Sequence, residues 1–228
     1  MIPAIVVVET APSPTSNTPS LPSAGLIEAA CVTAENYIIR KMLKLFRSGL
    51  PERETSVAMV GPRPGDALLF VLGGPGRPSA ADLDLAGRAG AVAGLNGRTT
   101  IVDQTADVSA RIDAAGGKHG ALLEHVNAPF DQLPFESDTF DVAVAANLAS
   151  WPADARLPRL SEALRVTRPA GRLILIVPAV KSLLGGGAPL VKDDEVLLLL
   201  TRLGTVANRK LARVDRASYF EARKPRAV

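Results

Sequence analysis

The sequence predicts a doubly wound α/β domain whose mostly parallel seven-stranded sheet ends in an antiparallel C-terminal hairpin strand. Short, unbroken apolar runs alternate with stretches of helical spacing between residues 67 and 177, which is typical of right-handed strand–helix–strand units. Apolar residues make up 47% of the 228 residues and aromatic residues only 4%. Ala, Val, Leu and Ile must therefore build the core, as they do in buried parallel strands.

The chain begins with a segment that is expected to be a flexible tail over residues 1–23. Pro, Ser and Thr dominate residues 10–23, and a segment of this composition buries too little apolar surface to offset the entropy of ordering.

Residues 24–54 are expected to form a helical cap. Apolar residues recur at three- and four-residue steps over residues 24–46, which predicts an amphipathic helix that Gly49, Leu50 and Pro51 end. This helix either covers the sheet or forms a lid over a pocket, and the covering role is favoured because apolar stripes usually pack against a core.

The domain itself is expected over residues 55–228. Its predicted helices cover residues 55–60, 79–93, 106–115, 157–166 and 195–203, and its predicted strands cover residues 67–72, 99–102, 122–126, 140–146, 172–177, 206–214 and 218–223.

Local signals in the first half support these elements. Ser79 and Asp82, three residues apart, form a capping box that opens a helix directly after a glycine-rich loop. The next helix is predicted from the spacing of Val108 and Ile112, and the pair Gly116–Gly117 is expected to stop it.

The second half has signals of a different kind. The run Phe140–Ala146 contains small apolar residues throughout, which predicts a strand buried on both faces. Pro169, Ala170 and Gly171 are expected to form a tight turn that starts the fifth strand. The last two strands are joined by a turn near Asp215, so they are predicted to form an antiparallel hairpin at one edge.

The charge of the chain favours no nucleic-acid partner. The net charge is +3, and the basic residues are scattered except for a short cluster of Arg40, Lys41, Lys44 and Arg47. Aromatic residues for base stacking are scarce near this cluster, so a solvated helix face is favoured over a nucleic-acid site.

Cysteine usage and hydropathy indicate a cytoplasmic location. Cys31 is the only cysteine, which excludes an internal disulfide and a thiolate metal cluster drawn from this chain alone. No apolar run is long enough to anchor the protein in a membrane. The sequence leaves the oligomeric state open, a homodimer included.

Polar residues and glycines follow three of the predicted strands, at the edge where open parallel sheets bind ligands. The loop after residue 72 is rich in glycine, which lets a ligand approach the backbone closely. Asp103 can accept hydrogen bonds from the ribose hydroxyls of a nucleoside, or it caps the next helix. Asn127 can bond an adenine edge, or it is a turn former.

Two longer blocks resemble a known family. The stretch from Leu133 to Asn147, with its Leu133-Pro-Phe start, and the stretch from Glu162 to Ile174, with its Arg-Val-Thr-Arg-Pro-Ala-Gly-Arg core, are similar to blocks of the class I S-adenosylmethionine-dependent methyltransferases. The resemblance extends from about Val57 to Pro225. It implies a Rossmann-like fold, S-adenosylmethionine as cofactor and methyl transfer to an acceptor.

The resemblance also implies which residues bind the cofactor. They are Gly73, Gly74, Gly76, Asp103, Gln104, Asn127, Ala128 and Asn147. No metal site and no catalytic residue is identified, because methyl transfer can proceed by proximity and alignment. The Asn/Asp-Pro-Pro-Tyr/Phe box of enzymes that methylate nucleic-acid amino groups is absent, which favours a small-molecule acceptor.

The first glycine motif departs from the family pattern. Leu72 stands where the family has an acidic residue that recognises the methionine end of the cofactor, Pro78 stands at the third glycine, and Arg77 adds positive charge. Losing one charge-assisted hydrogen bond weakens affinity by about tenfold to a hundredfold. An inactive binding or assembly module is therefore the alternative. A nicotinamide-dependent oxidoreductase is a third hypothesis, and the two sequence blocks speak against it.

Overall fold

The computed structural model describes residues 50–73, 77–105, 107–178, 191–214 and 217–226. The chain divides into two compact units, residues 1–48 and residues 49–228, and all the described residues belong to the second. The predicted tail and the predicted amphipathic helix over residues 24–46 lie outside the described residues.

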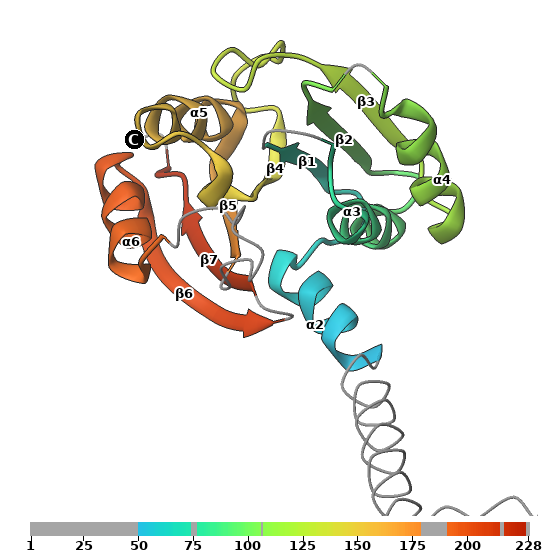
Figure 1. Cartoon of the computed structure of the whole chain (residues 1–228), viewed down its shortest axis with the longest axis horizontal. Coiled ribbons are helices and arrows are strands. Elements are labelled where there is room, and N and C mark those ends of the chain that lie inside the picture. The colour runs from blue at the N-terminus through green and yellow to red at the C-terminus, as the bar shows by residue number, and fades with distance from the viewer. Residues whose placement is uncertain (1–49, 74–76, 106, 179–190, 215–216, 227–228) are drawn as a thin grey trace, which may run out of the picture. The chain divides into compact units, whose positions relative to one another are not determined.

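The second unit is a seven-stranded sheet with helices on both faces (Figure 1). The strands are β1 Ala67–Leu72, β2 Arg98–Asp103, β3 Leu123–Asn127, β4 Phe140–Ala146, β5 Thr167–Pro178, β6 Val206–Val214 and β7 Ala217–Arg223. The helices are α2 Leu50–Val60, α3 Ala80–Ala93, α4 Ser109–His119, the short 3₁₀ helix η1 Leu148–Ser150, α5 Ala153–Val166 and α6 Asp193–Arg202.

The strand order is β3-β2-β1-β4-β5-β7-β6. Neighbours from β3 to β5 pair in parallel, whereas β7 pairs antiparallel with both β5 and β6. The predicted fold class, with its C-terminal hairpin at one edge, is confirmed.

Two apolar layers hold the sheet between the helices. Side chains alternate across a strand, so Leu69 and Val71 of β1 pack in the layer with α5 and α6, while Leu68 and Phe70 pack in the layer with α2, α3 and α4. All four are at most 1% exposed. Both faces of the central strands are therefore dry, which explains why these strands read as unbroken apolar runs.

The capping box was predicted correctly. Ser79 is the N-cap of α3, and its hydroxyl accepts a hydrogen bond from the Asp82 N–H at 3.1 Å. The same hydroxyl donates to the Asp82 carboxylate at 2.7 Å. The first strand and the fourth strand begin and end at the predicted residues.

The prediction that Gly116 and Gly117 stop the second helix is wrong. Helix α4 runs through both and ends at His119, and its C-cap Gly120 has a φ of 66°, in the left-handed region that favours glycine. A Cβ on Gly116 would lie 2.6 Å from the carbonyl oxygen of Ala121. This glycine is therefore required by close packing against the chain that enters β3, and not by the end of a helix.

Two helices begin earlier than predicted. Leu50 and Pro51 are helical residues of α2, which runs from Leu50 to Val60 in the described residues, whereas the sequence predicts a helix there only over residues 55–60 and a helix stop at Leu50 and Pro51. Helix α5 begins at Ala153 and contains Pro158, where the sequence predicts a start only at residue 157.

The predicted tight turn before the fifth strand is an irregularity inside β5. Ala170 has a φ of 61°, and the pairing register between β4 and β5 jumps between Phe140 and Val142. The strand continues on both sides of this point, so the chain bends there without leaving the sheet.

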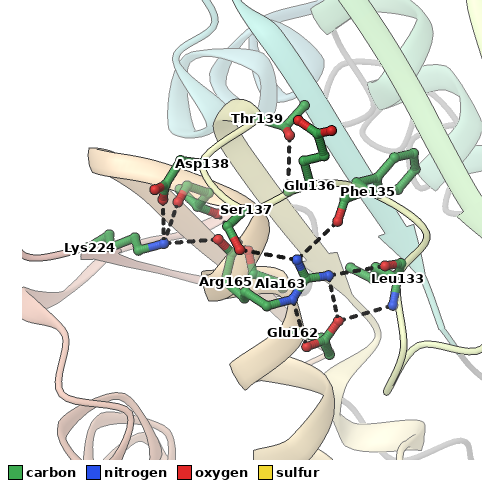
Figure 2. A network of polar contacts seen from close by, with 11 residues as sticks. Leu133, Phe135, Glu136, Ser137, Asp138, Thr139, Glu162, Ala163, Arg165 and Lys224 are labelled. Atoms are coloured by element: carbon green, nitrogen blue, oxygen red, sulfur yellow. Dashed lines mark hydrogen bonds and ion pairs between the residues drawn. The ribbon is translucent and has the colours of Figure 1, made fainter.

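The two sequence blocks meet in one polar network (Figure 2). The Arg165 guanidinium donates to the carbonyl oxygens of Leu133 and Phe135 at 3.0 and 2.9 Å and to the Glu162 carboxylate at 2.9 Å. Glu162 in turn accepts from the Leu133 N–H at 3.1 Å. The hydrogen bond from Arg165 lowers the pKa of Glu162. The blocks therefore tie the loop before β4 to helix α5.

Candidate functional site

The carboxyl ends of four parallel strands lie at one edge of the sheet. Leu72 at the end of β1 pairs with Ala146 at the end of β4, so Gly73 and Asn147 follow as neighbours. Asp103 at the end of β2 pairs with Asn127 at the end of β3. The structure thus gathers at one edge the described residues that the resemblance assigns to cofactor binding, while Gly74 and Gly76 lie outside the described residues.

Gly73 has a packing role that the sequence does not reveal. A Cβ at this position would lie 2.0 Å from Nε1 of Trp151, so the absent side chain makes room for the indole. Trp151 is 2% exposed, and its ring stacks on Phe130 with 6.1 Å between centroids. Among the described residues its Nε1 has no hydrogen-bond partner.

Asp103 is held beneath the chain that follows it. Asp103 is only 1% exposed, and its Oδ1 accepts a hydrogen bond from the Thr105 N–H at 2.7 Å. The alternative that Asp103 caps the next helix is wrong, because the N-cap of α4 is Val108 and no side chain caps it. The bond to Thr105 closes a turn after β2 instead, and a carboxylate can accept further bonds. Gln104 and Asn127 are exposed on either side of it, and Ala128 is buried in the layer that contains Trp151.

Asn147 connects β4 to helix α3. Its φ of 57° places it in the left-handed region, which asparagine tolerates better than most residues. Its Nδ2 donates to Oδ2 of Asp82 at 2.9 Å, and its carbonyl oxygen accepts from the Ser150 hydroxyl at 2.7 Å. The Asp82 contact joins residues 65 positions apart, and sequence reasoning, which saw Asp82 only as a cap residue, missed it.

The three departures from the family motif have distinct environments. Leu72 is 2% exposed and belongs to the apolar layer beneath α3, where a carboxylate would be unfavourable without a partner. The Arg77 side chain is 61% exposed and lies 3.7 Å from Asp107, so solvent and this carboxylate screen its charge. The Pro78 carbonyl accepts from Arg111 at 2.9 Å.

A cavity of about 520 Å³ opens beside Asn147. Its apolar wall comes from the ends of the strands and from α3 and includes Leu85, Ile176, Pro178 and Val214. The amide of Asn147 and the carboxylate of Asp82 also line it. A cavity of this size and mixed lining is typical of small-molecule sites.

Four ionisable residues form a cluster at the α4 side of this cavity: Asp84, Arg88, Lys118 and His119. Asp84 accepts hydrogen bonds from Arg88 at 2.8 Å, from His119 at 2.9 Å and from Lys118. Burial raises the pKa of Asp84, but the bonds from Lys118, Arg88 and His119 outweigh it and hold that pKa well below its ordinary value. His119 is the last residue of α4.

The described residues contain no group of three or more His, Cys, Asp and Glu side chains arranged to hold a metal ion. Likewise, none of the described helices is both long and apolar enough to cross a bilayer.

Comparison with known families decides what this arrangement is. A family model described as "Methyltransferase domain" matches residues 83–175, the part of the chain that contains β2 to β5 and both sequence blocks. Over these residues the chain is similar to the class I S-adenosylmethionine-dependent methyltransferases. S-adenosylmethionine is the cofactor of this family, as the resemblance implies.

Curated relatives of this domain agree. The ubiquinone/menaquinone biosynthesis C-methyltransferase UbiE of Ruegeria sp. is 31% identical over 129 residues, which cover 54% of this chain and 47% of the relative. The enzyme of the same name from Brucella canis is 33% identical over 129 residues, which cover 54% of this chain and 45% of the relative. The matched part spans about half the length of these relatives.

Solved structures share the fold of this domain. A SAM-dependent methyltransferase from Aquifex aeolicus has a TM-score of 0.58 at 20% identity and covers 75% of this chain and 87% of its own. The 1,6-didemethyltoxoflavin-N1-methyltransferase of Burkholderia thailandensis has a TM-score of 0.52 at 19% identity, covering 90% and 93%. The cyclase SpnF, with a TM-score of 0.56 at 17% identity, covers 77% and 80%. The fold therefore hosts more than one chemistry, and function has to be argued from the site.

Proposed function

We propose that this domain transfers the methyl group of S-adenosylmethionine to a small-molecule acceptor. The observation that carries the proposal is the convergence of Gly73, Asp103, Asn127 and Asn147 at the carboxyl edge of the sheet in a domain similar to this family. The cofactor would supply an electrophilic methyl group on a positively charged sulfur.

The residues at the ends of β2 and β3 fit the adenosine half of the cofactor. The Asp103 carboxylate keeps acceptor capacity beyond its one bond to Thr105, and it stands beside the exposed carboxamide of Asn127. We assign Asp103, with Gln104, to the ribose and Asn127, with Ala128, to the adenine. Because Asp103 is 1% exposed, a ribose must displace part of the chain that covers it.

The methionine half meets a different surface. Leu72 is a core side chain and offers no carboxylate, so we assign recognition of this half to backbone groups around Gly73, Gly74, Gly76 and Asn147. The exposed position of Arg77 beside Asp107 makes its repulsion of a sulfonium weaker than the sequence predicts.

The cavity beside Asn147 is the place we assign to the acceptor. It opens next to the end of β4, adjacent to Gly73, so a bound acceptor would lie close to the reacting methyl group. A small-molecule acceptor is supported by the size of the cavity and by the relatives, which are named for quinone biosynthesis and for methylation of didemethyltoxoflavin.

The test is calorimetric titration of the full chain with S-adenosylmethionine and with S-adenosylhomocysteine. We expect both to bind, and we expect Asp103→Ala to weaken binding by about tenfold or more because a charge-assisted hydrogen bond is lost. The matched control is Asp113→Ala, an exposed residue of α4, which should leave the affinity unchanged. Absence of heat from the wild-type protein at millimolar cofactor would refute the proposal. The family match and the curated relatives give the inactive-module alternative no support.

A further inference from the structure

The cavity beside Asn147 contains one carboxylate with an unusual set of partners. Asp82 lines the cavity, and its Oδ2 accepts hydrogen bonds from the Ser79 hydroxyl at 2.7 Å and from Nδ2 of Asn147 at 2.9 Å. Both donors are neutral. No Lys, Arg or His among the described residues forms an ion pair with it.

The cations that line the same cavity are engaged elsewhere. Arg88 and Lys118 both donate to Asp84, at the α4 side of the cavity. Asp84, Arg88 and Lys118 are therefore held in one cluster, and Asp82, in the first turn of α3, has no basic side chain among the described residues within ion-pair distance. The two neutral donors fix the orientation of this carboxylate without neutralising it.

One side of the cavity is largely apolar, although Ser56 and Tyr219 also line the cavity. Ile176, Pro178 and Val214 come from the ends of β5 and β6. A ligand gains by burying an apolar body against these side chains, and a polar end of it can lie against Asp82. That end faces a group which accepts hydrogen bonds and cannot donate one.

We propose that Asp82 receives the hydrogen-bond donor of the methyl acceptor, and that the acceptor is an uncharged, largely apolar molecule with an O–H or N–H group beside its reacting atom. This inference rests on the proposed function, because it takes the bound molecule to be the methyl acceptor. The recognition itself is a binding property. Anionic molecules are disfavoured because Asp82 repels them. The two carboxylates and the two cations that line the cavity balance in number. The repulsion of anions is therefore attributed to Asp82 and not to the overall charge of the cavity.

Three naphthalene derivatives of similar size test the proposal by calorimetry on the full chain, in the presence of saturating S-adenosylhomocysteine. They are 2-naphthol, which carries an O–H donor, 2-methoxynaphthalene, which has none, and 2-naphthoate, which is an anion. We expect 2-naphthol to bind about tenfold more tightly than 2-methoxynaphthalene, the effect of one hydrogen bond to a charged acceptor, and 2-naphthoate to bind more weakly than 2-naphthol.

The variant Asp82→Asn should abolish the preference for 2-naphthol over its methyl ether while leaving the affinity for S-adenosylhomocysteine unchanged. Asp82→Glu keeps the charge and should retain part of the preference. The matched control is Asp154→Asn, which removes a first-turn carboxylate from α5 instead of α3 and should change neither affinity. The helix cap survives in Asp82→Asn because Ser79 accepts from the backbone N–H of residue 82.

The outcomes separate this inference from the proposed function. Equal affinities for 2-naphthol and its methyl ether in the wild-type protein, or a preference that persists in Asp82→Asn, would overturn it. Loss of S-adenosylhomocysteine binding in Asp82→Asn would also overturn it, by placing the cofactor in this cavity. If the wild-type protein ignores S-adenosylhomocysteine but still prefers 2-naphthol in an Asp82-dependent way, donor recognition stands and the proposed function fails.

Discussion

Gly73 and Trp151 pack so closely that a Cβ on residue 73 would lie 2.0 Å from the indole nitrogen. The glycine comes from the end of β1 and the tryptophan from the turn after β4, 78 positions later in the chain. The packing of Trp151 therefore requires a glycine at residue 73, in addition to any requirement set by a ligand. Substitution of this glycine changes stability before it changes binding.

Gly73→Ala should destabilise the domain by about 1–3 kcal/mol, because the added methyl group forces the indole or the loop to move. Urea unfolding followed by circular dichroism measures the change. Gly117→Ala is the matched control, since a Cβ there meets nothing within 4 Å and alanine favours a helix interior by about 0.5–1 kcal/mol. A Gly73→Ala protein as stable as wild type would contradict the packing of Trp151 against this residue.

Arg165→Ala should destabilise the domain by about 1.5–3 kcal/mol, because the Glu162 carboxylate and the carbonyl oxygens of Leu133 and Phe135 lose a charged donor. Arg77→Ala removes an arginine whose side chain is 61% exposed and whose partner Asp107 is 91% exposed, and its cost should stay below about 1 kcal/mol. The comparison is made by thermal unfolding of both variants. Equal costs would show that the network of Figure 2 is no stronger than a surface pair.

Asp84→Asn should be less stable than wild type at pH 7 and nearly equal to it in strong acid. The pKa of Asp84 is depressed in the folded state, so its contribution is present above the pKa of the unfolded chain and is lost as pH falls toward the folded value. The groups facing it are Arg88, Lys118 and His119. Urea unfolding of both proteins at pH 7 and at pH 2 measures the difference, and a gap that does not shrink in acid would contradict the pairing.

Pro158→Ala should stabilise the domain by about 1–2 kcal/mol. Pro158 is exposed and lies inside α5, beyond the first turn, where proline removes a helical hydrogen bond. The gain is reduced because alanine also loosens the unfolded chain. Differential scanning calorimetry compares this variant with Leu157→Ala, at a neighbouring helix position that is also exposed. A fall in the melting temperature of Pro158→Ala would show that Pro158 is required for the packing of α5.

The elements with strong periodicity were predicted with correct bounds or nearly so. The strands Ala67–Leu72 and Phe140–Ala146 are buried on both faces, so their apolar runs end where the sheet ends. Errors occur where glycine and proline serve packing. The sequence predicts a helix stop at Gly116, because a local pattern does not reveal the Ala121 carbonyl against which this glycine packs.

The sequence predicts the strand ends at which the candidate site residues lie, but it does not predict most of their side-chain contacts. Asp103, Asn127 and Asn147 follow strands, and parallel topology brings strand ends together. The contacts of Asn147 with Asp82 and of Gly73 with Trp151 join residues far apart in sequence. No spacing rule predicts these two contacts, and the assignments of individual residues to the cofactor stay predictions.

By itself, the sequence determined the class of fold and the order of its elements, because hydrophobic period and turn chemistry are local properties that repeat along the chain. Only the tertiary structure decided which carboxylates are neutralised. Asp84 and Asp82 are two residues apart on one helix, yet one meets three basic side chains from α3 and α4 and the other meets a serine and an asparagine. Coulomb interactions depend on distance in space, and that distance exists only once the helices have packed.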